Sequence, residues 1–126
     1  AARNIVFTGT LTQKELSSYY KKAKVHILPS WFETCGLSSL EAASMGCNIV
    51  ITDKGYTRDY FGDDAFYCNP ASPESIYKAV VLASKSETSN QLKEKILNEF
   101  TWVHAAKKTL KAYQEILSPT QKFCYH

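Results

Sequence analysis

Short apolar runs alternate with longer amphipathic stretches along this chain. Runs rich in β-branched and aromatic residues occupy positions 4–8, 25–28, 48–52 and 65–68, and glycine, proline or polar residues bound them, as is typical of buried strands. Between these runs, apolar residues recur every three or four positions, which predicts helices with one core-facing side. Strands that alternate with helices over short connections predict a parallel sheet with right-handed crossovers.

Local residue patterns mark where several helices begin. Thr12 to Glu15 has the form of a capping box, and Ser72 followed by Pro73 is an N-cap with proline at the first helical position. Further helices are expected over residues 36–45, about 92–100, and 102–117. The predicted fold class is therefore α/β, a partial Rossmann-like domain of about four parallel strands with helices on both faces.

The length of the chain limits its domain organisation. Its 126 residues suffice for one core but not for two Rossmann-type halves. We expect one domain over residues 1–117, followed by a tail over 118–126. Four strands are fewer than the roughly six of a complete doubly wound sheet, and the chain starts with Ala1 rather than methionine. These features predict a domain that lacks its first strands, cut from a longer polypeptide.

Composition and charge narrow the classes of partner. The hydrophobic fraction is 44%, yet no run approaches the roughly 18 apolar residues of a membrane span. The net charge is +3 and the lysines are scattered, so no nucleic-acid partner is predicted. Two groups of lysines allow two interpretations. They either make peripheral contact with an anionic inner membrane face or, more simply, lie on solvated surfaces. These lysines are Lys21, Lys22, Lys24, Lys107, Lys108 and Lys111.

The four cysteines form no CxxC pair and have no metal-ligand spacing with the three histidines. Free thiols in a reducing compartment fit this usage, so a cytoplasmic location is expected.

The candidate chemistry lies between the second and third predicted strands. In an open α/β sheet, ligands bind where the carboxyl ends of strands meet the N-termini of helices. We expect the free amides of Gly36, Leu37 and Ser38, with the positive end of the helix, to form an anion site suited to phosphate. Glu33 precedes this helix and Glu41 lies about one turn inside it, so two carboxylates bracket the amides.

Those carboxylates indicate a hydroxyl-rich ligand. Hydrogen bonds to a charged acceptor contribute about 1.5–3 kcal/mol each, so the two glutamates suit the two polyhydroxylated rings on either side of a diphosphate. A nucleotide sugar has this chemistry. Spacing alone leaves an alternative, in which Glu41 is a solvated helix residue and Glu33 merely complements the helix dipole.

The same segment resembles the E-x7-E signature of retaining glycosyltransferase family 4, whose members have the two-domain GT-B architecture. Glu33 and Glu41 fall on the two glutamates of that signature. The resemblance extends over about residues 5–113. Further matches are Pro29-Ser30, Gly36-Leu37, Ala42, Gly46 and Val50, with flanking blocks at 6–9, 16–20, 52–55 and 69–70.

The resemblance implies the donor-binding part of an enzyme that transfers a sugar from a nucleotide-diphosphate sugar with retention of anomeric configuration. Glu33 would be the catalytic residue, contacting the donor sugar and stabilising its developing charge, and Glu41 would accept hydrogen bonds from the ribose. The amides of residues 36–38 would hold the distal phosphate, and the loop at Gly9 and Thr10 would lie against the base.

Other implications concern groups outside this chain. Neither a metal ion nor a cofactor is implied, since the nucleotide sugar is itself the substrate. A glycan or lipid-linked acceptor would be bound through the missing N-terminal domain, so this chain alone is expected to be inactive. The apolar side of the last helix would pack partly against that domain and, left uncovered, would favour self-association.

Several positions leave the interpretation open. Cys35 lies within the signature, where it either contacts the substrate or serves only in packing. Trp31 and Phe32 either form a sugar-stacking platform or belong to the core, and the core is the expectation. Asn48 stands where proline is usual in the family. Rival functions are epimerisation or hydrolysis of a nucleotide sugar, and a non-catalytic module that serves binding or assembly.

Overall fold

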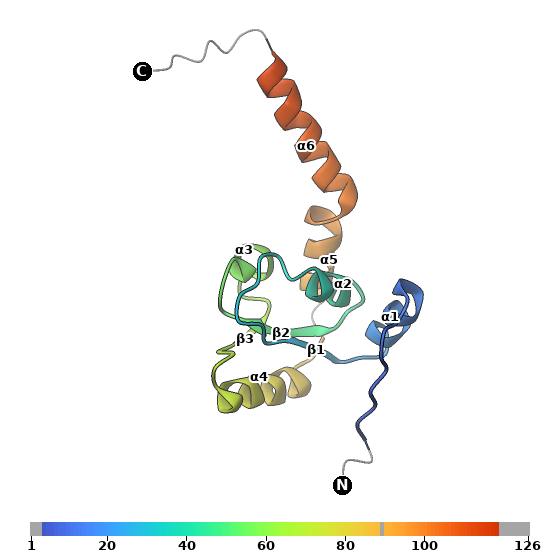
Figure 1. Cartoon of the computed structure of the whole chain (residues 1–126), viewed down its shortest axis with the longest axis vertical. Coiled ribbons are helices and arrows are strands. Elements are labelled where there is room, and N and C mark those ends of the chain that lie inside the picture. The colour runs from blue at the N-terminus through green and yellow to red at the C-terminus, as the bar shows by residue number, and fades with distance from the viewer. Residues whose placement is uncertain (1–3, 89, 119–126) are drawn as a thin grey trace.

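The computed structural model describes residues 4–88 and 90–118, so all but the first residue of the expected tail lies outside the described residues. A parallel sheet lies at its centre (Figure 1). The three strands are β1 (Val25–Leu28), β2 (Asn48–Thr52) and β3 (Phe66–Cys68), in the order β1-β2-β3. Parallel pairing sets Val25 opposite Asn48 and Val50 opposite Phe66.

Helices cover both faces of this sheet, as predicted. Figure 1 shows α4 on one face and α2 with α5 on the other, while α6 projects away from the body. The α/β fold class is therefore confirmed. The helices are α1 (Gln13–Tyr20), α2 (Leu37–Ser44), α3 (Thr57–Phe61), α4 (Pro73–Lys85), α5 (Asn90–Glu99) and α6 (Trp102–Leu117).

The core is organised around β2, whose five residues are all buried. Successive side chains of a strand point to opposite faces, so β2 contributes to two apolar clusters. Ile49 and Ile51 pack in the cluster beneath α2 and α5, and Val50 packs with Ala79 and Ala83 of α4. A central strand covered on both faces explains why residues 49–51 are apolar without alternation.

The strand predicted over residues 4–8 is absent, so the sheet has three strands in the described residues rather than four. Ile5, Val6 and Phe7 are exposed, Phe7 to 93%. A strand needs a partner for its backbone groups. In the described residues β1 pairs with β2 alone, and no strand lies beside residues 4–8.

The helix starts predicted from capping residues are confirmed. Thr12 and Glu15 form the reciprocal capping box of α1, and the Ser72 side chain caps α4. None of the residues of α1 is fully buried, but Leu16 and Tyr20 are half-buried and Tyr20 packs against the main apolar cluster, so its expected core-facing side is partly covered. The short helix α3 was not predicted, because five residues are too few for a helical period to stand out.

Asn48, which stands where the resembled signature usually has proline, has a clear structural role. Its buried amide nitrogen Nδ2 donates hydrogen bonds to the carbonyl oxygens of Ala83 at 2.9 Å, Ser86 at 3.3 Å and Glu87 at 3.3 Å. These carbonyls lie at the end of α4 and just beyond it, where backbone acceptors lack helical partners. Asn48 therefore fastens the C-terminal end of α4 to the start of β2.

We predict that Asn48→Ala lowers the free energy of unfolding by about 1–3 kcal/mol, because carbonyl groups at the end of α4 lose their donor. Urea unfolding monitored by circular dichroism measures this loss. The matched control is Asn98→Ala on the exposed side of α5, which should change the same quantity by less than about 0.5 kcal/mol. Equal losses in both variants would contradict the role given to Asn48.

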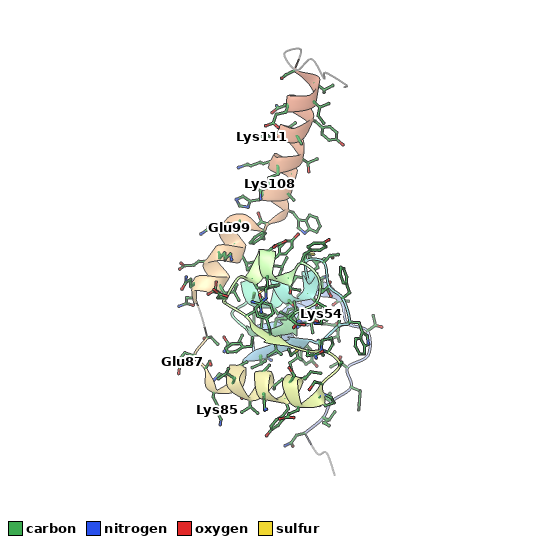
Figure 2. All side chains as sticks on the ribbon, turned by 90° about the vertical axis from the view of Figure 1, so that its left-hand side faces the viewer. Lys54, Lys85, Glu87, Glu99, Lys108 and Lys111 are labelled. Carbon is green, nitrogen blue, oxygen red and sulfur yellow. The ribbon has the colours of Figure 1, made fainter. Side chains whose placement is uncertain are left out.

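No helix in the described part of the chain is long and apolar enough to cross a membrane. The helix α6 is instead amphipathic, and its apolar residues are uncovered. Leu110, Tyr113 and Leu117 are exposed to 57%, 61% and 79%, while Lys111 lies on the opposite side. Figure 2 shows Lys111 pointing away from α6 into solvent. An uncovered apolar side of this kind is a candidate contact surface.

We predict that the chain self-associates through this side of α6 as its concentration rises. Tyr113→Gln combined with Leu117→Gln should reduce the association, because it removes apolar area from the contact. The control Lys111→Gln changes an equally exposed residue on the polar side and should leave association in place. Light scattering over a concentration series decides, and a strict monomer at every concentration would contradict the prediction.

Candidate functional site

The loop before α2 is held against the loop after β2. The backbone N–H of Glu33 donates to the carbonyl of Lys54 at 3.2 Å, and the N–H of Tyr56 donates to the carbonyl of Glu33 at 3.0 Å. These bonds make a short parallel bridge between Glu33 and Gly55. The two loops follow neighbouring strands, β1 and β2, so the bridge extends their pairing beyond the sheet.

The Glu33 carboxylate already has partners within the protein. The Ser30 hydroxyl donates to its Oε2 at 3.1 Å, and the backbone N–H of Gly36 donates to its Oε1 at 3.3 Å. The side chain therefore caps the start of α2, where amides lack helical partners. A carboxylate offers about four acceptor positions, so both oxygens retain capacity for a ligand.

Glycine is required at position 36. Its φ of 64° lies in the left-handed region, and a Cβ there would stand 2.9 Å from Cδ1 of Ile51 in the core. The prediction of three free amides is wrong for Gly36, whose N–H is taken by Glu33. The amides of Leu37 and Ser38 donate no hydrogen bond within the described residues, as the first turn of a helix leads one to expect.

Glu41 differs from Glu33 in its surroundings. It is half-buried on α2, and within residues 4–88 and 90–118 its carboxylate takes part in no hydrogen bond or ion pair. Burial of the Tyr20 side chain raises the pKa of that hydroxyl, and the nearby Glu41 charge raises it further. The Glu41 carboxylate is thus available to a donor from outside the protein.

A cavity of about 760 Å³ opens beside Glu41. It lies between the loop before α2, the helices α2 and α3, and the junction of α5 with α6. Its walls are mostly apolar and aromatic, with a few charged groups, which is the usual character of a ligand site. The lining includes Cys35, Leu37, Glu41, Tyr56, Trp102 and Lys108.

The structure brings part of the predicted site together. Cys35, Leu37 and Glu41 line the cavity, whereas Glu33, Gly36 and Ser38 lie next to these residues in the chain without lining it. Cys35 also packs against the main apolar cluster, so both of its interpretations remain. The predicted base-contacting residues are exposed in the extended segment before α1 and do not line the cavity; they are Gly9 and Thr10.

Trp102 and Lys108 were not predicted as site residues. They reach the cavity because α6 begins beside α2, although they lie more than sixty positions beyond Glu41 in the chain. Figure 2 shows Lys108 near the base of α6, close to the α5 end that carries Glu99. No spacing rule links such distant segments, so no pattern in the sequence could have indicated these two residues.

The expectation that Trp31 and Phe32 belong to the core is wrong. Their side chains are exposed to 74% and 61%, and the Phe32 ring meets the Tyr56 ring edge-on at 6.1 Å between centroids. Both aromatic rings are thus available on the surface of the loop before α2. In the described part of the chain, no cluster of three or more His, Cys, Asp and Glu side chains could hold a metal ion.

Among solved structures, the chain is similar to sucrose-phosphate synthase from Thermosynechococcus elongatus. The TM-score is 0.77 at 20% sequence identity, over 88% of this chain and 30% of that one. At this identity the similarity establishes the fold alone. The three strands and their helices are arranged as in part of that structure.

Sequence comparison identifies the family. The model described as "Glycosyl transferases group 1" matches residues 1–86, and the chain therefore belongs to this glycosyltransferase family. The resemblance seen in the sequence is confirmed.

Individual relatives align with most of this chain, but the chain matches only a small part of each relative. An uncharacterised glycosyltransferase of Methanocaldococcus jannaschii is 27% identical over 117 residues, or 87% of this chain and 30% of the relative. Sulfoquinovosyl transferase of Arabidopsis thaliana is 40% identical over 74 residues, which are 55% of this chain and 14% of the relative. A glycogen synthase of Mycobacterium tuberculosis is 28% identical over 114 residues, which are 85% of this chain and 28% of the relative. The chain thus spans less than a third of these relatives.

We predict that the two glutamates differ in their effect on stability. Glu33→Ala should lower the free energy of unfolding by about 1 kcal/mol, because Gly36 and Ser30 lose their acceptor. Glu41→Ala should change it by less than about 0.5 kcal/mol, because no partner is lost. Urea unfolding at neutral pH measures both. If both residues were only helix-end charges, the two losses would be similar, at about 0.3–1 kcal/mol each.

Proposed function

We propose that this chain is the donor-binding part of a glycosyltransferase that transfers a sugar from a nucleotide-diphosphate sugar with retention of anomeric configuration. The observation that carries the proposal is the Glu41 carboxylate, which lines a cavity of about 760 Å³ and has no partner among the described residues. The amides of Leu37 and Ser38, which donate to no group in the described part of the chain, lie one turn earlier in α2. An acceptor for hydroxyl groups next to donors for phosphate is the combination that a nucleotide sugar requires.

Each group then has a separate task. Glu41 accepts hydrogen bonds from the ribose hydroxyls, and the amides of Leu37 and Ser38 donate to the distal phosphate as it gains charge. Glu33 contacts the donor sugar through the acceptor capacity that its bonds to Ser30 and Gly36 leave free. Its charge stabilises the positive character that the sugar acquires as the bond to phosphate breaks.

A cation in the cavity supports binding of a diphosphate. Lys108 shares the cavity wall with Glu41, and its ammonium group can approach a bound phosphate from α6. Arg58 of α3 lies over the Tyr67 ring at 3.9 Å and is engaged there. We therefore assign the role of phosphate partner within this chain to Lys108 rather than to Arg58.

The chemical step follows from the proposed geometry of the donor. In a retaining transfer of this type, the departing phosphate accepts the proton of the attacking hydroxyl on the same face of the sugar. The acceptor, a glycan or lipid-linked sugar, is contacted by the other domain of a GT-B enzyme. We place the protein in the cytoplasm, with a lipid-linked acceptor giving a reason for peripheral contact at the inner membrane face.

The first prediction from this proposal separates the two glutamates in a transfer-competent polypeptide that contains this chain. Glu41→Ala should weaken binding of the nucleoside diphosphate and raise KM more than it lowers kcat, because ribose hydrogen bonds are equal in the ground and transition states. Glu33→Ala should lower kcat by about 10²-fold or more, with nearly unchanged nucleoside diphosphate affinity. Calorimetry beside steady-state kinetics measures both effects.

The control for that experiment is Glu74→Ala, which removes an exposed carboxylate on α4, away from the cavity. It should change neither kinetic constant. Each variant must show the circular dichroism spectrum of the parent before its kinetics are compared. Small and equal effects of Glu33→Ala and Glu41→Ala would overturn the assignment.

A second prediction concerns the chain on its own. The 126 residues should transfer no labelled sugar to any acceptor in a broad screen, because catalysis depends on positioning the acceptor as well as on charge stabilisation. Binding without turnover is therefore the expected behaviour. Measurable transfer by the purified chain would show that it carries the acceptor site as well.

A further inference from the structure

One residue outside the E-x7-E segment holds the backbone of Glu33 in place. Gly55 follows β2 and forms the parallel bridge with Glu33. Its φ is 98°, and a Cβ built on it would overlap the carbonyl oxygen of Glu33 and stand 2.9 Å from the carbonyl carbon and 3.0 Å from the nitrogen. The loop can lie this close only because residue 55 has no side chain.

Two hydrogen bonds depend on that close approach. The Glu33 N–H donates to Lys54 and the Glu33 carbonyl accepts from Tyr56, the residues on either side of Gly55. The peptide groups of residue 33 are thus fixed from both sides. Fixing the backbone in this way also fixes the origin of the Glu33 side chain, whose carboxylate accepts from Gly36.

A side chain at position 55 must therefore displace Glu33. The colliding atoms belong to the backbone, which cannot rotate away as the end of a flexible side chain can. A displaced residue 33 cannot keep both the bridge to the loop after β2 and the hydrogen bond that its carboxylate accepts from the Gly36 amide. Loss of this hydrogen bond would release the carboxylate from its orientation at the start of α2.

We propose that Gly55 is a positioning residue, which aims the Glu33 carboxylate at the donor sugar by allowing the loop after β2 to clamp the Glu33 backbone. The part of this proposal that concerns the sugar rests on the function proposed above. Gly55 itself touches no substrate. It acts through Glu33, so its substitution should change recognition of the sugar and leave recognition of the nucleotide largely intact.

The chain offers a matched control. Gly46 has the same φ of 98°, but a Cβ built there meets nothing within 4 Å. Gly46→Ala therefore carries the same left-handed backbone strain as Gly55→Ala without the collision. Any difference between the two variants reports the contact with Glu33 and not the strain common to both.

The first arm of the test needs no ligand. In the 126-residue chain, Glu33→Ala should shift the NMR signal of the Gly36 amide, because that amide loses the acceptor of its hydrogen bond. Gly55→Ala should shift the Gly36 signal in the same direction, and Gly46→Ala should leave it in place. A Gly36 signal unchanged in Gly55→Ala would overturn the positioning role.

The same spectra show whether the fold persists. Hydrogen exchange of the β2 amides should stay protected in Gly55→Ala, because the collision lies outside the strand. General loss of that protection in Gly55→Ala, with protection kept in Gly46→Ala, would show that Gly55 supports the whole fold. That outcome would also overturn the specific role.

The second arm tests the sugar. Calorimetry compares UDP, ADP and GDP with their glucose and mannose conjugates, and the pair that binds the wild-type chain is carried forward. Gly55→Ala should remove about tenfold of the preference for the conjugate over the free diphosphate, and Gly46→Ala should remove none. Adding Gly55→Ala to Glu33→Gln should cause no further loss, since both act through one carboxylate.

The two proposals fail in different ways. If the wild-type chain binds none of these nucleotides, donor binding by this chain is wrong, while the NMR signal of the Gly36 amide still decides whether Gly55 positions Glu33. If the wild type prefers the conjugate and Gly55→Ala keeps the full preference, donor binding stands and the positioning role is wrong.

Discussion

Burial of β2 on both faces is the constraint on which the rest of this structure depends. Its five residues are covered by α4 on one side and by α2 with α5 on the other, so the strand can take only the central position of the sheet. Parallel pairing with β1 then brings the ends of the two strands to one edge. The loop that carries Glu33 and the loop that carries Gly55 meet there for that reason, and their bridge continues the pairing.

The site built at this edge contains two glutamates in unlike environments. Glu33 is bonded to Ser30 and Gly36 and contributes to the local structure, whereas Glu41 faces the cavity without a partner in the described residues. A carboxylate with internal partners is held in one orientation, which suits contact with a reacting centre. One without partners gains more from binding external hydroxyls, because no internal bond is given up.

The family and the fold are established for this chain, but a shared architecture does not by itself establish a reaction. Members of one fold carry out different reactions, so the reaction must be argued from the site. Here the relatives include enzymes named for different products, a glycogen synthase and a sulfoquinovosyl transferase among them. The groups that this chain offers to a ligand, two carboxylates and a pair of helix amides, are the basis of the proposed donor binding and indicate no particular acceptor.

The sequence by itself determined the class of fold, the capped starts of α1 and α4, the E-x7-E glutamates and the family. These depend on residues near one another in the chain, where hydrophobic period and capping chemistry act locally. It did not determine that residues 4–8 stay unpaired, because a strand forms only if a distant segment supplies its partners. Only the tertiary structure decided that Trp102 and Lys108 share a cavity with Glu41 and that Gly55 lies against Glu33. Contacts between remote segments follow from how the layers pack, and local sequence patterns do not encode them.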